Sequence, residues 1–173
     1  MTKFLDKTLF LEDEKATTEL ATNIAAALEN LFGGVNSFSK DNSNEGVIVY
    51  LLGDLGAGKS FLSRALIQYF LPEQKVKSPT YTLVETYSVE GIAPFAIHHF
   101  DLYRLCDPEE LEYLAIRDLL AHKSLNLVEW PSKGKGVMPE ADLVIELQHL
   151  DAGRNVQLSA QSDVGQVIID SMS

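Results

Sequence analysis

The residues with the most specific chemistry lie in the segment GDLGAGKS at positions 53–60. This segment fits the pattern G-x-x-x-x-G-K-[ST], the phosphate-binding P-loop or Walker A motif. Its glycines allow backbone dihedral angles closed to other residues, so successive N–H groups can converge on phosphate oxygens at the start of the following helix. We expect Lys59 to reach the β- and γ-phosphates of a nucleotide and the Ser60 hydroxyl to bind Mg²⁺, which prefers oxygen ligands. The rest of the predicted cradle consists of Asp54, Leu55, Gly56, Ala57, Gly58 and Phe61.

Two acidic residues stand at the ends of predicted strands. Asp101 follows the run 95–100, and Glu129 follows the run 125–128. Ligands of open α/β sheets bind beyond the carboxyl ends of the strands, and Mg²⁺-nucleotide chemistry needs carboxylates near the P-loop hydroxyl. We therefore assign Asp101 a Walker B-like role at the metal, where it is also a candidate for positioning the attacking water. Glu129 either binds the metal, directly or through water, or orients the attacking water; the alternative for each acid is a solvated carboxylate.

Other polar and aromatic residues allow more than one interpretation. The hydroxyls of Ser78 and Thr80 could sense a γ-phosphate as switch residues do, although a plain turn fits their spacing equally well. Trp130 could stack on a base, but core packing is the default for a single tryptophan. His98 and His99 point to opposite faces of a regular strand, so they cannot jointly chelate a metal. We interpret both histidines as packing residues.

The elements that must position these residues alternate between strands and helices. The apolar run 47–52 predicts a strand before the P-loop, and 61–67 predicts a helix after it. The other expected elements are a helix at 13–32, an antiparallel strand pair at 79–89 and 95–101, a helix from Asp107 through Leu120, a buried strand at 124–130, a hairpin of 142–150 with 155–160, and a terminal helix at 164–171. This order predicts an α/β P-loop NTPase fold, a mixed β-sheet flanked by helices, in a single domain over residues 1–173. The polar stretch 33–46 is expected to be a flexible surface loop.

Composition indicates a globular protein of a reducing compartment. The 173 residues are 46% hydrophobic, yet no apolar stretch approaches the ~20 residues of a membrane span. With Cys106 as the single cysteine no internal disulfide can form, so we expect the cytoplasm and no membrane partner. Cys106 itself is expected to be a small apolar filler. The net charge of −11 argues against a direct grip on nucleic acid, DNA included, because such proteins neutralise phosphates with basic side chains.

Several segments carry a resemblance beyond the P-loop. They are KSPTYTLVE at 77–85, HFDLYRL at 99–105, DPEELE at 107–112 and VEWP at 128–131. In order and spacing, and over most of residues 10–150, they resemble the TsaE (YjeE) family, the small bacterial ATPases of tRNA threonylcarbamoyladenosine biosynthesis. The resemblance implies a P-loop ATPase that uses ATP and Mg²⁺. It also implies work with TsaD and TsaB in transferring a threonylcarbamoyl group to the adenosine beside the anticodon, with tRNA contacted only through that complex.

The resemblance also implies roles for single residues. Lys59 and the P-loop amides look like the phosphate cradle, and Ser60 and Glu129 look like the magnesium ligands. Asp101 matches the other essential acid of the family, and Thr80 matches its switch-like threonine.

Three further points come from the same resemblance. The helix start from Glu14 to Thr17 is similar to the stretch that lies near the adenine in this family. Ser60 stands where relatives often have threonine, which keeps the hydroxyl. The stretch 33–46 looks longer than usual, so its length is a feature of this chain.

Two other functions compete with an ATPase. A small-molecule kinase would need an Arg-bearing lid, and the basic loop at 133–136 is the single lid-like segment in the sequence. A GTP-dependent switch protein would carry an N-K-x-D motif, which is absent, so ATP is expected over GTP. The sequence shows no obvious arginine finger, and we therefore expect slow hydrolysis by the isolated protein.

Overall fold

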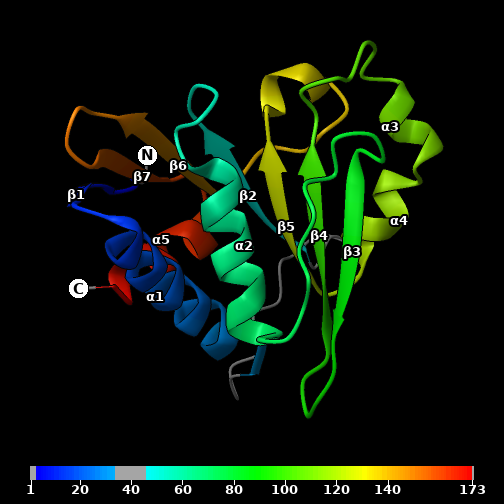
Figure 1. Cartoon of the computed structure of the whole chain (residues 1–173). Coiled ribbons are helices and arrows are strands. Elements are labelled where there is room, and N and C mark those ends of the chain that lie inside the picture. The colour runs from blue at the N-terminus through cyan, green and yellow to red at the C-terminus, as the bar shows by residue number, and fades with distance from the viewer. Residues whose placement is uncertain (1–2, 34–45, 173) are drawn as a thin grey trace.

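A seven-stranded mixed sheet forms the centre of the structure, a computed structural model that describes residues 3–33 and 46–172 (Figure 1). The strands are β1 (Asp6–Leu11), β2 (Gly46–Leu52), β3 (Val84–Val89), β4 (Phe95–Asp101), β5 (Ser124–Glu129), β6 (Leu143–His149) and β7 (Arg154–Ala160). The helices are α1 (Glu14–Gly33), α2 (Lys59–Phe70), α3 (Glu110–Tyr113), α4 (Ile116–Ala121), α5 (Asp163–Asp170) and the 3₁₀ helix η1 (Pro131–Gly134). The strand order across the sheet is β1-β7-β6-β2-β5-β4-β3.

The four central strands run parallel and the outer ones antiparallel. β2 pairs in parallel with β5 and β6, and β4 pairs in parallel with β5. The pairs β1–β7, β6–β7 and β3–β4 are antiparallel. Because β2, β4 and β5 point the same way, the P-loop, Asp101 and Glu129, which end or follow these strands, lie along one edge of the sheet.

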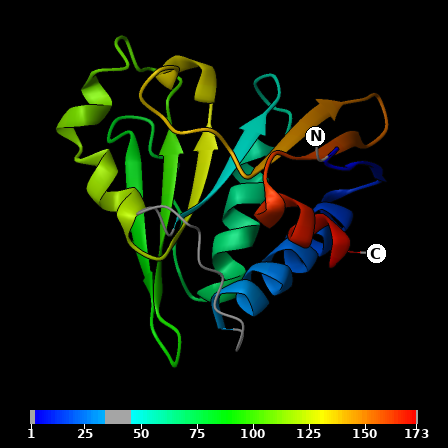
Figure 2. The same ribbon diagram turned by 180° about the vertical axis from the view of Figure 1, so that it is seen from behind.

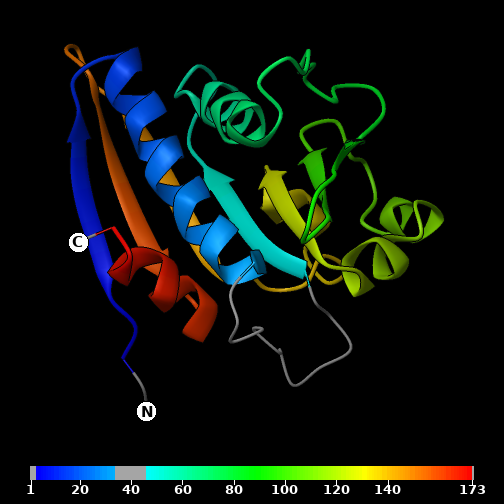
Figure 3. The ribbon, with the colours of Figure 1, turned by 90° about the horizontal axis from the view of Figure 1, so that it is seen from below.

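Two hydrophobic clusters, one on each face of the sheet, hold the helices in place. Alternate residues of β2 show the division: Val49 packs in the cluster that contains the buried side chains of α1, α2 and α5, and Ile48 packs in the cluster that contains those of α3 and α4. Figure 3 shows α1 and α2 side by side, and Figure 2 shows α3 and α4 near the β3–β4 end of the sheet. Burial of both faces explains why β2 is a nearly continuous apolar run, while β5, buried at every position, still carries Ser124 and Asn126.

Hydrogen bonds fix the start of α1 and join the N-terminal segment of the described chain to α5. The Asp13 carboxylate accepts a hydrogen bond from the Ala16 N–H at 2.8 Å and so caps the start of α1. The N–H of Leu5 donates to the Gln166 side chain of α5 at 2.8 Å. The edge strand β1 is thus fixed by α5 as well as by its pairing with β7.

The predicted mixed sheet with flanking helices is confirmed, one strand has no counterpart among the sequence expectations, and two local expectations are wrong. β1 is a strand that the sequence patterns do not predict. The strand expected from residue 79 begins at Val84, because Leu83 has a left-handed φ of 65°. The single helix expected from Asp107 through Leu120 is two short helices, separated at Ala115, which has a φ of 52°.

Three sequence expectations concern the surface and surroundings of the chain. The predicted flexible loop at 33–46 lies, apart from its end residues, outside the described residues. Within the described residues no helix is long and apolar enough to cross a membrane. Cys106 is exposed, so the expectation that it fills the core is wrong.

Candidate nucleotide site at the P-loop

The P-loop is shaped by glycines with positive φ. Gly53, Gly56 and Gly58 have φ values of 144°, 80° and 108°. A Cβ on Gly53 would stand 2.5 Å from the Leu147 carbonyl oxygen, so the β2 end packs directly on β6. Gly58 begins α2 without a side-chain cap, which leaves the N–H groups of the first turn open to an anion.

Lys59 lies folded back over the loop. Its Nζ donates to the carbonyls of Gly53 and of Asp54, the second at 3.1 Å, and stands 4.2 Å from the centroid of the Trp130 ring. Burial lowers the pKa of Lys59, and the nearby carboxylates of Glu129, Asp101 and Asp54 act against that shift. The ammonium group is thus held inside the site by neutral carbonyl oxygens, which charged phosphate oxygens can replace.

Glu129 joins the P-loop to the middle of the sheet. Its Oε1 accepts a hydrogen bond from the Ser60 hydroxyl at 3.1 Å, and its Oε2 lies 2.7 Å from His99 Nε2. Glu129 and His99 are both almost fully buried, and both carboxylate oxygens are occupied. The carboxylate is therefore fixed in one orientation, facing the Ser60 hydroxyl.

Asp101 is the direct neighbour of Glu129 across the β4–β5 pairing. It accepts a hydrogen bond from the Tyr103 N–H at 3.1 Å and a long one, 3.4 Å, from the Ser78 hydroxyl. The Thr80 hydroxyl donates to Ser78 at 3.4 Å. Partial burial raises the pKa of Asp101, and the charge of Glu129 adds to this effect.

These side chains line one cavity of about 370 Å³. The structure brings together in it the P-loop from Asp54 to Phe61, Thr80, Asp101 and Glu129, all named from the sequence. Ser78, Tyr103, Arg104 and Trp130 complete the lining.

Two residues named for the nucleotide do not line this cavity. Glu14 begins α1 with an exposed side chain, and Thr17 is buried, its hydroxyl donating to the Asp13 carbonyl at 3.3 Å.

Sequence reasoning misses two features of the site. His99, interpreted from the sequence as a packing residue, is buried, but it also holds Glu129. Trp130, expected in the core, is half-buried beneath Lys59 with its ring 5.0 Å from that of Tyr103. The motif VEWP is the available signal for Trp130, while the His99 contact depends on the register between β4 and β5.

The oxygen donors at the P-loop fit Mg²⁺. Ser60 and Glu129 present a hydroxyl and a carboxylate 3.1 Å apart, with Asp101 in the same cavity. Magnesium at nucleotide sites keeps several waters and phosphate oxygens as ligands, so few protein ligands are needed. Accordingly, the described residues contain no cluster of three or more His, Cys, Asp or Glu side chains suited to a metal.

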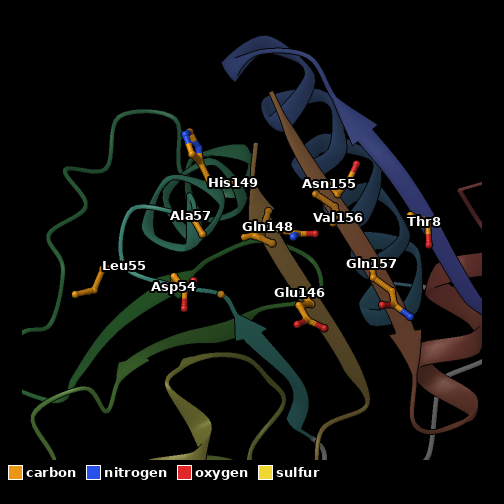
Figure 4. Close-up of a pocket in the computed structure, with 12 residues that line it drawn as sticks. Thr8, Asp54, Leu55, Ala57, Glu146, Gln148, His149, Asn155, Val156 and Gln157 are labelled. Carbon is orange, nitrogen blue, oxygen red and sulfur yellow. The ribbon is translucent and has the colours of Figure 1, made fainter. Parts of the chain in front are cut away.

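A second, larger cavity of about 540 Å³ borders the P-loop on its β6–β7 side (Figure 4). Its walls carry polar side chains of β1, β6 and β7, among them Thr8, Glu146, Gln148, Asn155 and Gln157. The cavity is wide but lacks Lys59, Ser60 and the two site acids. The smaller cavity is therefore the candidate phosphate site.

Comparison with known proteins identifies the family. The sequence profile described as "Threonylcarbamoyl adenosine biosynthesis protein TsaE" matches residues 11–156. The chain belongs to the TsaE family. This confirms the resemblance seen in the separate sequence segments.

Relatives and a solved structure agree with membership of the TsaE family. The tRNA threonylcarbamoyladenosine biosynthesis protein TsaE of Haemophilus influenzae is 48% identical over 134 residues, covering 78% of this chain and 83% of that protein. The protein of the same name from Rickettsia bellii is 35% identical over 150 residues, covering 86% and 91%. A crystal structure of YdiB from Bacillus subtilis matches with a TM-score of 0.71 at 19% identity, covering 99% of this chain and 97% of that one. The last likeness confirms the fold.

Proposed function

We propose that this TsaE family member is an Mg²⁺-dependent ATPase that acts in the cytoplasm, with TsaD and TsaB, in the threonylcarbamoyladenosine modification of tRNA beside the anticodon. The supporting observation is the meeting, in one cavity, of open P-loop amides, Lys59 and the Ser60–Glu129 contact. The names of the relatives support the pathway. The net charge of −11 supports contact with tRNA through the partners.

Binding would begin at the start of α2. The N–H groups of the P-loop would bind phosphate oxygens, and Lys59 would exchange its carbonyl partners for the β- and γ-phosphates. Because the site is partly closed to water, these donors would stabilise the charge of the transition state more strongly than they could in bulk solvent.

Ser60 and Glu129 would hold the metal, directly or through water. Bound Mg²⁺ would supply Lewis-acid stabilisation of the charge that develops on the phosphate oxygens. His99 keeps the Glu129 carboxylate facing Ser60.

The two acids suit different tasks. Glu129 is held at both oxygens, which favours a fixed ligand. Asp101 has a pKa raised by burial, which makes its carboxylate a better proton acceptor, and this favours the orientation of the attacking water. Thr80 would contact the γ-phosphate and couple its presence to Asp101 through the hydrogen bonds that link Thr80, Ser78 and Asp101.

The test is ATP turnover with Mg²⁺ by the purified protein, alone and with purified TsaD and TsaB. Lys59→Ala and Glu129→Gln should each lower the partner-stimulated rate by about 100-fold, as is typical when one transition-state contact is lost. Lys75→Ala and Glu140→Gln are matched controls, because both side chains are exposed and lie outside the cavity.

Three outcomes would contradict the proposal. A fast rate without partners would remove the partner-stimulated part. Intact protein that binds ATP without any stimulation would remove the coupling to TsaD and TsaB. Rapid phosphorylation of a metabolite would support a small-molecule kinase in its place.

A further inference from the structure

Arg154, the first residue of β7, contacts the P-loop from far along the chain. Its Nη1 donates to the Ala57 carbonyl at 3.2 Å. A Cβ placed on Gly58 would stand 1.9 Å from the same nitrogen and 3.1 Å from Cζ. The guanidinium group therefore lies directly against the Ala57–Gly58 turn, in space that glycine leaves free.

The sheet fixes the position of this arginine. Its backbone pairs with Leu11 of β1 and with His149 of β6. The tight turn before it contains Gly153, with a φ of 74° and a Cβ position 2.4 Å from the Leu11 carbonyl oxygen. The backbone of Arg154 is thus held between β1 and β6, so little backbone entropy remains to be lost when its side chain contacts the P-loop.

Arg154 approaches the P-loop from the side of β2 opposite to the strands that carry Asp101 and Glu129. In the sheet order, β6 and β7 lie on one side of β2, and β5, which carries Glu129, lies on the other. Figure 4 shows Ala57, His149 and Asn155 among the residues that line the cavity on the β6–β7 side. The P-loop is therefore held from both sides, by the Ser60–Glu129 contact and by Arg154.

We propose that Arg154 is a positioning residue of the nucleotide site, which holds the Ala57–Gly58 turn so that the P-loop amides converge before phosphate arrives. A hydrogen bond from a charged donor is about twice as strong as a neutral one, and glycine at position 58 leaves room for the guanidinium group. A loop held in its binding shape loses less entropy on binding, which raises its affinity for phosphate chains. This inference rests on the proposed ATP site.

The first test needs no nucleotide. Amide hydrogen exchange of the P-loop N–H groups is compared in the nucleotide-free protein and in Arg154→Ala. We expect at least about tenfold faster exchange in the variant at Ala57 and Leu62, whose N–H groups donate to the Asp54 and Gly58 carbonyls, because the local opening loses one charged hydrogen bond. Arg117→Ala is the matched control, since the Arg117 side chain is 85% exposed on α4 and lies far from the loop.

The second test measures the affinity for ADP and for ATP with a fluorescent nucleotide analogue. Arg154→Ala should weaken both roughly tenfold while kcat changes by less than about threefold, because the cradle serves both nucleotides. Arg154→Lys keeps the charge and one donor, and should recover part of the lost affinity. The thermal midpoint of each nucleotide-free variant shows whether it is folded.

The outcomes separate this inference from the proposed function. If the wild-type protein does not bind ADP or ATP, the proposed function fails, and the exchange experiment still decides whether Arg154 holds the loop. If the wild-type protein binds both and Arg154→Ala changes neither exchange nor affinity, the role of Arg154 is refuted. A loss of kcat alone, with affinity unchanged, would also refute positioning, because it would mark a contact made in the transition state.

Discussion

The buried contact between His99 and Glu129 leads to a quantitative prediction. Nε2 and Oε2 are 2.7 Å apart, and the two side chains are 1% and 3% exposed. Replacing His99 by leucine leaves the carboxylate buried with Ser60 as its remaining hydrogen-bond donor among the described side chains. Breaking a buried pair costs about 3–5 kcal/mol, and because the Ser60 bond survives we expect a loss near the lower limit, about 3 kcal/mol.

The measurement is a double-mutant cycle by urea unfolding at pH 7 in buffer without magnesium. His99→Leu, Glu129→Leu and the double variant are compared with the wild type. Since each single variant leaves one polar group stranded and the double variant leaves none, the double should be destabilised by about 2 kcal/mol less than the sum of the singles. Singles that add within about 0.5 kcal/mol would refute the interaction.

Three further predictions concern the loop, a histidine and the tryptophan. Gly53→Ala should lower the free energy of unfolding, measured in urea, by about 3 kcal/mol, because the added Cβ would clash with the Leu147 carbonyl oxygen of β6. Gly56→Ala, which has open space around it, should cost about 1 kcal/mol, and equal costs for the two variants would contradict the close packing at Gly53. Burial lowers the pKa of His98 below 6.5, so the unfolded state binds more protons and the free energy of unfolding should fall as pH drops below 6.5. Urea unfolding of His98→Gln at several pH values should show a smaller dependence of this free energy on pH. Binding of ADP should draw Lys59 away from the ring of Trp130, the single tryptophan, and so change its fluorescence emission in a titration. An unchanged spectrum at saturation would contradict the contact between Lys59 and Trp130.

Local patterns explain what is predictable from the sequence. The P-loop, Asp101 and Glu129 can be placed together because each follows a predicted strand, and parallel strands bring their ends to one edge. β1 cannot be found in the same way, since its exposed edge position requires no strong apolar alternation. The break at Ala115 carries no glycine or proline as a signal, so the left-handed residue there depends on tertiary packing.

Contacts between distant segments are beyond local patterns. His99 meets Glu129 through the register of two strands 30 residues apart, and Arg154 meets Ala57 across 97 residues. Neither pair leaves a mark in the spacing of one segment. Residues that hold functional side chains in place are for this reason harder to predict than the functional side chains themselves.

The position of Arg154 also has a consequence for synthesis on the ribosome. The P-loop emerges early, whereas β7, which carries the arginine and pairs with β1, emerges near the end of the chain. Joining such distant strands requires closing a long loop, which slows folding. A nascent chain would therefore contain the complete P-loop well before it could bind a nucleotide with full affinity. Full affinity would require the β6–β7 hairpin to form.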